Sequence, residues 1–233
     1  MMAKTYKHIF FDLDHTIWDF EQSAFHTFQM MFDKYQLKEK GIPSLAEFLK
    51  QYTHHNTRLW ESYRNGALKK EVLRSLRFAQ TLESFGIVEN GLAEQLGDDY
   101  VYYSPRTVFL MPGAGETIEQ LADKYHLHLI TNGFEEVQHI KLKESGLKSF
   151  FQTMTTSEEA GVKKPDIAIF NYALQKAGAI ASESIMIGDD LEVDVLGAKN
   201  AGLDQVFFNP EGMAHNEAIT HDIRDLNALL SIF

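Results

Sequence analysis

The sequence contains no cysteine, no long apolar run and no excess of basic residues. The lack of cysteine excludes disulfide bonds, a thiol nucleophile and a cysteine-ligated metal, and it favours a reducing compartment. The apolar run Ile9–Phe11 ends before a signal peptide could form, and no stretch approaches the about 18 apolar residues that a membrane span needs. We therefore expect a cytoplasmic protein without a membrane partner, whose chemistry uses other side chains.

The charge balance limits the partners. The chain has 22 Lys and Arg residues against 33 Asp and Glu residues, a formal net charge of -11. Such a charge opposes binding to a nucleic-acid polymer, although a mononucleotide could still bind in a local pocket. With 233 residues, 44% of them hydrophobic, the chain can form one large domain or a core with an insertion. The sequence leaves the oligomeric state open.

Strand-like and helix-like segments alternate from Leu110 to the C-terminus. This alternation predicts a doubly wound, Rossmann-like parallel sheet in an α/β core. The expected strands end within 126–133, 150–161, 184–190 and 205–209, and the expected helices cover 134–146, 165–178, 194–202 and 222–233.

The stretch from 18 to 105 has helical periodicity and no convincing strand. Phe25, Phe28 and Phe32 recur at the spacing of one helix face, and Ser44 with Glu47 forms a plausible capping box. The expected second domain is therefore all-helical and inserted after the first strand.

The predicted domain boundaries follow from this insertion. We expect a discontinuous α/β core over 1–17 and 106–233, interrupted by a helical domain over 18–105.

The segment KHIFFDLDHTIWDF, residues 7 to 20, places two aspartates after a short apolar strand. Ile9–Phe11 is typical of a strand buried on both faces, and Asp12 and Asp14 follow where it ends. At a spacing of two they would project to the same side, so a cation or a shared proton is needed to offset their repulsion.

Other polar side chains follow the later strands. Thr131 with Asn132, then Lys164, then Asp189 stand at or beyond predicted strand ends. Each alone could be a turn, a solvated lysine or a helix cap, but ligands of open α/β sheets bind at the carboxyl ends of the strands. A carboxylate that attacks phosphorus needs nearby cations, and Mg²⁺ prefers oxygen ligands. The set therefore indicates phosphoryl transfer through an aspartyl phosphate with a Mg²⁺ cofactor.

The motifs DLDHT, ITNG, KKP and GDDLEVD, in this order, resemble the haloacid dehalogenase superfamily of phosphatases, over essentially the whole chain. The resemblance implies that Asp12 is the nucleophile and Asp14 the general acid and base. It also implies that Lys164 pairs with the nucleophile and the phosphate.

The same resemblance implies the phosphate and metal sites. Thr131, with the backbone of Asn132 and Gly133, would bind the phosphate. Mg²⁺ would be bound by the Asp12 side chain, the Asp14 backbone carbonyl and Asp189, while Asp194 would support the waters of the metal. Two neighbours of these positions, Lys163 and Asp190, are left without an assigned role.

The helical insertion resembles the first cap type (C1) of this superfamily, which closes over the site and reads the leaving group. The strings DHTIWDF, LWESYRNGALKKEVLRSLRF, TNGF and SEEAGVKKPD resemble its pyrimidine 5'-nucleotidase branch, which implies a nucleoside monophosphate as substrate. Candidates for a wall that stacks on the base are Trp18, Phe20, Trp60 and Tyr63, although packing in a core is the commoner role of such residues.

Other functions fit these motifs less well. A phospho-accepting receiver domain is shorter and has no helical insertion, and a non-catalytic scaffold would not retain every reactive group. A dehalogenase would not need Asp14, because a halide leaves without a proton. A sugar-phosphate phosphatase or phosphomutase with the same cap type is the main alternative.

Overall fold

The computed structural model describes residues 5–233; positions 1–4 of the expected core lie outside the described residues. The chain divides into two compact units, which are Met1–Phe20 with Val108–Phe233, called the α/β unit here, and Glu21–Thr107, called the helical unit. The first unit is discontinuous in sequence. Its boundaries fall two or three residues after those drawn from the sequence at 17 and 105.

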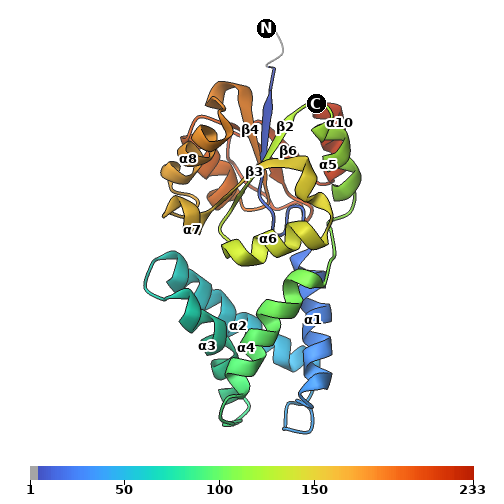
Figure 1. The fold of residues 1–233 in the computed structure, drawn as a ribbon, viewed down its shortest axis with the longest axis vertical. Helices are drawn as coiled ribbons and strands as arrows, with labels where there is room; N and C mark the ends of the chain where they lie inside the picture. The colour runs from blue at the N-terminus through green and yellow to red at the C-terminus, as the bar shows by residue number, and fades with distance from the viewer. Residues whose placement is uncertain (1–4) are drawn as a thin grey trace. The chain divides into compact units, whose positions relative to one another are not determined.

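The α/β unit contains a sheet of six parallel strands in the order β3-β2-β1-β4-β5-β6, with helices on both faces (Figure 1). The strands are β1 (His8–Phe11), β2 (His126–Thr131), β3 (Phe151–Thr156), β4 (Ser184–Gly188), β5 (Asp204–Phe208) and β6 (His221–Ile223). The helices are α5 (Ala114–Ala122), α6 (Glu135–Glu144), α7 (Ser157–Ala160), α8 (Ile167–Ala177), α9 (Gly197–Asn200) and α10 (Leu229–Ile232), with a π-helical turn at Leu191–Leu196 and 3₁₀ turns at Leu147–Phe150, Ala181–Glu183 and Leu226–Ala228. This order confirms the predicted doubly wound sheet.

Alternate residues of each central strand enter the two cores of this unit. In β1, Ile9 and Phe11 pack in the core that α5 and α10 cover, while Phe10 packs against α8 on the opposite face. All three side chains are buried, as expected for a strand covered on both faces. The chain order reverses between β1 and β4, the topological switch point at which ligands of such sheets bind.

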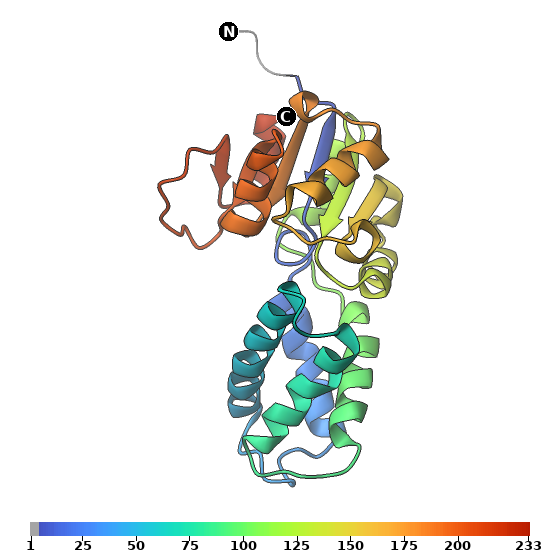
Figure 2. The ribbon, with the colours of Figure 1, turned by 90° about the vertical axis from the view of Figure 1, so that its left-hand side faces the viewer.

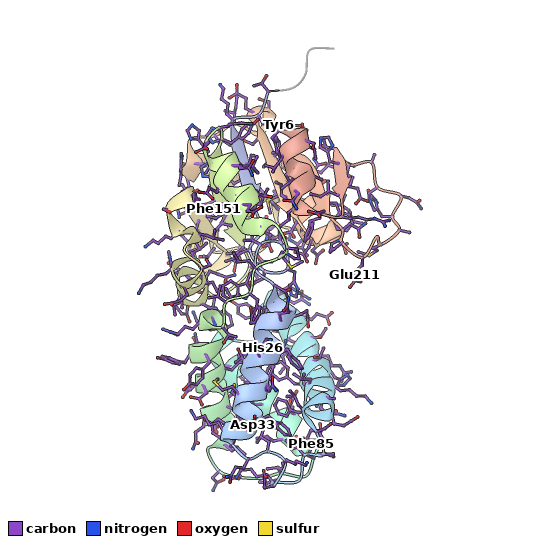
Figure 3. The ribbon with its side chains drawn as sticks, turned by 90° about the vertical axis from the view of Figure 1, so that its right-hand side faces the viewer. Tyr6, His26, Asp33, Phe85, Phe151 and Glu211 are labelled. Carbon is purple, nitrogen blue, oxygen red and sulfur yellow. The ribbon has the colours of Figure 1, made fainter. Side chains whose placement is uncertain are left out.

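The helical unit consists of four helices around an aromatic core (Figure 2). They are α1 (Phe20–Lys34), α2 (Leu45–Arg64), α3 (Lys70–Glu83) and α4 (Leu92–Tyr103), and a 3₁₀ turn at Ser104–Arg106 follows them. Phe28 contacts Tyr52 and Tyr100 with ring centroids 4.4 Å and 4.8 Å apart. Asp33 near the end of α1 and Phe85 just after α3 lie at one end of this bundle (Figure 3).

Two details of the helical unit test the sequence pattern. The Ser44 hydroxyl accepts a hydrogen bond from the Glu47 N–H at 3.2 Å, which confirms the Ser44 half of the capping box expected there. Phe28 and Phe32 are buried, but Phe25 is 45% exposed, so its predicted place on the buried face was wrong. The buried stripe of α1 is narrower than the spacing of its phenylalanines indicates.

The C-terminal segment differs from the single helix predicted over 222–233. β6 adds a three-residue edge strand to the sheet, and only Leu229–Ile232 is α-helical. The helix predicted over 194–202 is a π-helical turn at Leu191–Leu196 followed by α9. Among the helices of residues 5–233, none is both long enough and apolar enough to cross a membrane.

Candidate active site

A buried lysine joins two aspartates at the carboxyl end of the sheet. The Lys164 ammonium lies 2.5 Å from Asp12 Oδ1 and 2.6 Å from Asp194 Oδ1. Asp12 follows β1, and its N–H donates to the Ile187 carbonyl of β4 at 2.9 Å, which fixes it at the switch point. All three charged side chains are buried. The structure thus brings together Asp12, Lys164 and Asp194, which lie far apart in the sequence.

Asp189 completes an acidic cluster beside this lysine. Asp12, Asp189 and Asp194 each offer a carboxylate oxygen, and these oxygens lie within 4.8 Å of one another. The Thr16 hydroxyl donates to Asp189 Oδ1 at 2.9 Å, while Asp194 Oδ2 accepts from the Asp190 N–H at 3.1 Å. Second partners therefore orient Asp189 and Asp194.

Burial and mutual repulsion raise the pKa values of two of these acids. Burial, with the neighbouring charges of Asp194, Asp189 and Asp14, raises the pKa of Asp12 well above its ordinary range, although Lys164 opposes this shift. Burial, followed by Asp194, raises the pKa of Asp189 to about 7. The cluster is thus short of positive charge.

This donor set fits a magnesium ion. Buried carboxylate oxygens are the ligands that Mg²⁺ prefers, and a divalent cation would relieve the repulsion that raises both pKa values. Lys164 supplies one positive charge beside three carboxylates, so a divalent cation would balance the remaining negative charge of the ionised cluster. The residues that would hold it are Asp12 and Asp189, with Asp194 beside them.

The Asp14 side chain is not part of this cluster and has a separate set of partners. Its Oδ1 contacts the Lys141 ammonium, and its Oδ2 accepts from Gln138 Nε2 at 2.7 Å. Burial favours the neutral acid, but Lys141 and Gln138 outweigh it and lower the pKa of Asp14. β1 ends at Phe11, so the period-two geometry of a strand does not extend to Asp14. The two aspartates therefore do not share one counter-ion.

The ITNG turn after β2 is held by side-chain hydrogen bonds. Thr131 Oγ1 accepts from the Gly133 N–H at 3.0 Å and from Gln138 Nε2 at 2.7 Å. The Asn132 side chain accepts from the Lys164 N–H at 2.9 Å and donates to the Lys164 carbonyl at 3.0 Å. Asn132 thus positions the backbone of Lys164.

The structure shows the surroundings of two positions whose roles the sequence left open, the lysine pair Lys163 and Lys164 and the acid Asp190. Lys164 contacts both Asp12 and Asp194, which identifies it, rather than Lys163, as the lysine of the cluster. Asp190 Oδ1 accepts from the Glu192 and Val193 N–H groups, so its side chain caps the π-helical turn. It is a cap, and the described cluster does not include it.

The aromatic candidates pack mainly in cores. Trp18 is 1% exposed and belongs to the core of the α/β unit, with Phe20 packed against that core. In the helical unit, Trp60 meets Tyr63 edge to face at 5.4 Å, and Tyr63 is buried.

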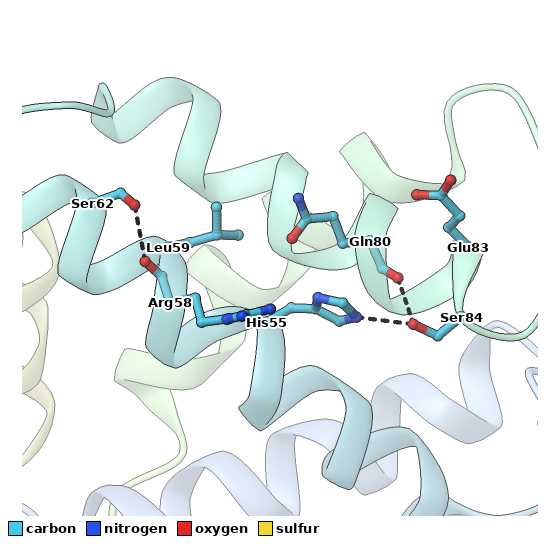
Figure 4. A pocket seen from close by; sticks show the side chains of 7 residues that line it. All are labelled: His55, Arg58, Leu59, Ser62, Gln80, Glu83 and Ser84. Atoms are coloured by element: carbon cyan, nitrogen blue, oxygen red, sulfur yellow. Dashed lines mark hydrogen bonds between the residues drawn. The ribbon is translucent and has the colours of Figure 1, made fainter.

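The surface of the helical unit has a separate hollow between α2 and α3 (Figure 4). Its polar groups bond to one another: His55 Nε2 lies 2.9 Å from Ser84 Oγ, and the Ser84 hydroxyl donates to the Gln80 carbonyl. Its lining shows no acidic cluster and no buried charge comparable with the site around Asp12.

Sequence motifs did not identify Gln138, Lys141 or Thr16 as members of the site. Gln138 and Lys141 are three residues apart on α6, so they share a face, and both are buried. The only signal was two polar residues at this spacing in a helix that begins just after ITNG. Thr16 is the threonine of DLDHT, whose place in the motif was the available signal.

Comparisons with known proteins show the family to which this chain belongs. Residues 6–202 match the haloacid dehalogenase-like hydrolase family. The pyrimidine 5'-nucleotidase YjjG of Escherichia coli (strain K12) is 34% identical over 94% of this chain and 96% of its own, and the pyrimidine 5'-nucleotidase PynA of Streptococcus pneumoniae (strain ATCC BAA-255 / R6) is 30% identical over 91% and 87%. The magnesium-bound crystal structure of the HAD-hydrolase YfnB from Bacillus subtilis has a TM-score of 0.85 and 29% identity, covering 98% of this chain and 99% of that one. This chain is therefore a member of the haloacid dehalogenase-like hydrolase family.

Proposed function

We propose that the protein is a magnesium-dependent phosphatase that hydrolyses pyrimidine nucleoside 5'-monophosphates through an aspartyl phosphate. The observation that supports the substrate class is the similarity to two pyrimidine 5'-nucleotidases over more than nine-tenths of this chain. The chemistry is supported by a buried carboxylate, Asp12, that meets a buried ammonium, Lys164, beside two further acids.

The proposed reaction has two steps. An Asp12 carboxylate oxygen attacks phosphorus, while the bond from phosphorus to the ester oxygen breaks and that oxygen takes a proton from Asp14. Lys141 favours the ionised form of Asp14 in the free protein, and the negative charge of the bound phosphate would favour the protonated form that donates. A water oxygen then attacks the phosphorus of the aspartyl phosphate and gives a proton to Asp14, which releases inorganic phosphate and restores Asp12. Nucleophilic and proton-transfer roles are thus divided between two carboxylates with different surroundings.

Other residues bind the phosphate and the metal. Lys164 would offset the negative charge of the phosphate as it approaches Asp12, and the Thr131 hydroxyl would donate to a phosphate oxygen. Mg²⁺, when bound, supplies positive charge that offsets the charge of the phosphate and of the acids. It would be held by the side chains of Asp12 and Asp189 and by the Asp14 carbonyl, with Asp194 supporting its waters.

The substrate assignment is tested by comparing kcat/KM across a panel of phosphate esters with Mg²⁺ present. We expect UMP, dUMP and dTMP to exceed AMP and GMP, but modestly, because fit to an apolar pocket discriminates by only about 1–3 kcal/mol. Hexose and triose phosphates test the main alternative. If a sugar phosphate exceeded every pyrimidine nucleotide tenfold or more, the nucleotidase assignment would be wrong, while the phosphatase chemistry would stand.

A further inference from the structure

The surroundings of the proposed proton donor, Asp14, come from two segments of the α/β unit. α6 supplies Lys141 and Gln138, which contact the two different carboxylate oxygens of Asp14. The loop after β1 supplies Trp18 and Phe20, whose ring centroids lie 5.3 Å and 5.5 Å from the Lys141 ammonium. Asp14 thus meets one buried cation, which is itself held by two aromatic rings.

The loop conformation makes this arrangement possible. His15 has a φ of 63°, in the left-handed region, and its N–H donates to the Trp18 carbonyl at 2.8 Å. This tight turn returns the chain so that Trp18 packs beside the helix that carries Lys141. Besides Asp14 and Thr16, the string DHTIWDF therefore supplies the two aromatic rings beside Lys141.

Gln138 uses both of its N–H bonds within the site. Its Nε2 lies 2.7 Å from Asp14 Oδ2 and 2.7 Å from Thr131 Oγ1. The opposite orientation of the amide would place its oxygen against the ionised Asp14 carboxylate, which favours the orientation shown. One side chain thus links the proposed proton donor to the proposed phosphate-binding hydroxyl.

The bonds to Thr131 also determine the direction of its own proton. A hydroxyl has two acceptor positions and one donor position. Gly133 N–H and Gln138 Nε2 occupy both acceptor positions of Oγ1, so the O–H must donate to a third group. A phosphate oxygen is the acceptor that this arrangement suits.

Gly133 shows how closely Gln138 approaches the turn. A Cβ at position 133 would lie 2.0 Å from Gln138 Nε2. The glycine of ITNG therefore makes room for the glutamine.

We propose that Gln138 and Lys141 are positioning residues of the reaction: Lys141 holds Asp14 where it can protonate the leaving oxygen, and Gln138 aligns Asp14 with the Thr131 hydroxyl. This inference rests on the proposed function, since it requires Asp14 to protonate the leaving group. The two residues have different roles. Lys141 acts through Asp14 on the leaving group alone, whereas Gln138 acts also on the phosphate, through Thr131.

The experiment compares kcat/KM for UMP and for p-nitrophenyl phosphate in wild type and in Lys141→Met. This ratio reports the steps up to transfer of the phosphoryl group, and the nitrophenolate leaves with little need of a proton. We expect Lys141→Met to lower kcat/KM for UMP on the order of 10–100-fold and the value for p-nitrophenyl phosphate by less than about threefold. The exposed lysine of the same helix provides the control: Lys143→Met should match wild type with both esters.

A second variant tests the division of work. Gln138→Leu removes the bond to Thr131 as well as the bond to Asp14. Unlike Lys141→Met, it should therefore lower kcat/KM and raise KM for both esters. Thermal melts of each variant check that the fold is retained.

Asp14→Asn separates failure of this inference from failure of the proposed function. If Asp14→Asn lowers kcat/KM equally for both esters, the proposed acid role of Asp14 is wrong, and the positioning roles of Lys141 and Gln138 are wrong with it. Asp14→Asn could instead lower kcat/KM for UMP alone. If Lys141→Met then lowers kcat/KM equally for both esters, or for neither, the positioning role is overturned and the proposed function stands.

Discussion

Each aspartate of the first motif has its own buried lysine, Asp12 with Lys164 and Asp14 with Lys141. Removing an ammonium and a carboxylate from water costs several kcal/mol per ion, which a buried pair seldom recovers in full, so such pairs are weak sources of stability. Perturbed, buried charges gather at functional sites for this reason. The two pairs therefore support the proposed chemical roles of both aspartates more than they account for the stability of the fold.

The proposed nucleophile is tested most directly by Asp12→Asn, which keeps the size of the side chain and removes the charge proposed to attack phosphorus. We expect kcat to fall by several orders of magnitude. Because burial and the charges of Asp194 and Asp189 together outweigh Lys164 and disfavour an ionised Asp12, the variant should melt at the wild-type temperature or above it. Activity above roughly a tenth of wild type would contradict covalent catalysis by Asp12.

Motif residues could be predicted from the sequence because each follows a strand, and strand ends meet at one edge of a parallel sheet. Gln138 and Lys141 could not, because a polar residue on an amphipathic helix usually faces water. Their burial depends on where α6 lies against the loop after β1, which is a tertiary contact between segments over 100 residues apart. A local pattern does not contain that contact.

At the level of elements, the end of β4 and the following π-helical turn depend on a glycine. A Cβ at Gly188 would lie 2.4 Å from the Asp194 Cβ, far inside any real contact. Gly188 thus lets Asp194 reach Lys164 and the acidic cluster. The glycine of GDDLEVD is as necessary to the geometry as its acids.

We therefore expect Gly188→Ala to displace Asp194, to lower the stability by about 1–3 kcal/mol and to reduce kcat strongly. Gly115→Ala is the matched control, because a Cβ there would meet only Leu110 Cδ1 at 3.9 Å, an ordinary contact, within helix α5. Urea unfolding and kcat of both variants measure the two effects. Equal behaviour of the two variants would show that the close approach to Asp194 is unimportant.

The elements with strong patterns were predicted, and those with weak patterns were not. β1 and β4 are runs of apolar residues, and every residue of β4 is buried. β6 is three residues long, and two of them, His221 and Asp222, are polar. An edge strand of this length contains too few residues to show a period of two, so the segment resembles the start of the helix that follows.

β2 contains a buried histidine that makes stability depend on pH. Burial, with the charges of His8 and His126, lowers the pKa of His128 to about 4. Its Nε2 lies 3.1 Å from His8 Nδ1 and its Nδ1 lies 2.9 Å from Thr153 Oγ1. Below its ordinary pKa of 6.5 the unfolded chain takes up a proton that the folded protein does not, so stability falls as the pH drops toward 4.

A comparison of wild type with His128→Gln measures this contribution. We expect the free energy of unfolding, followed by urea denaturation between pH 7.5 and 4.5, to fall less steeply in the variant. One group contributes at most about 1.4 kcal/mol per pH unit to that slope. Parallel curves for the two proteins would rule out His128 as a source of the acid sensitivity.

At the level of the whole molecule, the fold gathers charges that the sequence separates widely. Three different strands, β1, β3 and β4, precede Asp12, Lys164 and Asp189 in the chain. These residues meet because parallel strands end at one edge of the sheet. Some of the acids counted in the formal net charge of -11, Asp12 and Asp194 among them, are thus buried where the ligand of an α/β sheet is expected. A protein that folds around uncompensated acids should gain stability from a cation that binds them.

Magnesium should therefore raise the melting temperature of the wild-type protein as well as its activity. A ligand that binds only the folded state stabilises it by about 2.7 kcal/mol at one hundred times its Kd, so millimolar Mg²⁺ in place of excess chelator should give a clear shift. Asp189→Asn removes one carboxylate of the cluster and should lose most of that shift, whereas Glu144→Gln, an exposed acid on α6, should respond like wild type. Melting is read without substrate, so the result does not depend on the nucleotide assignment. An identical melting temperature of the wild-type protein in Mg²⁺ and in chelator would contradict the proposal that this cluster binds Mg²⁺.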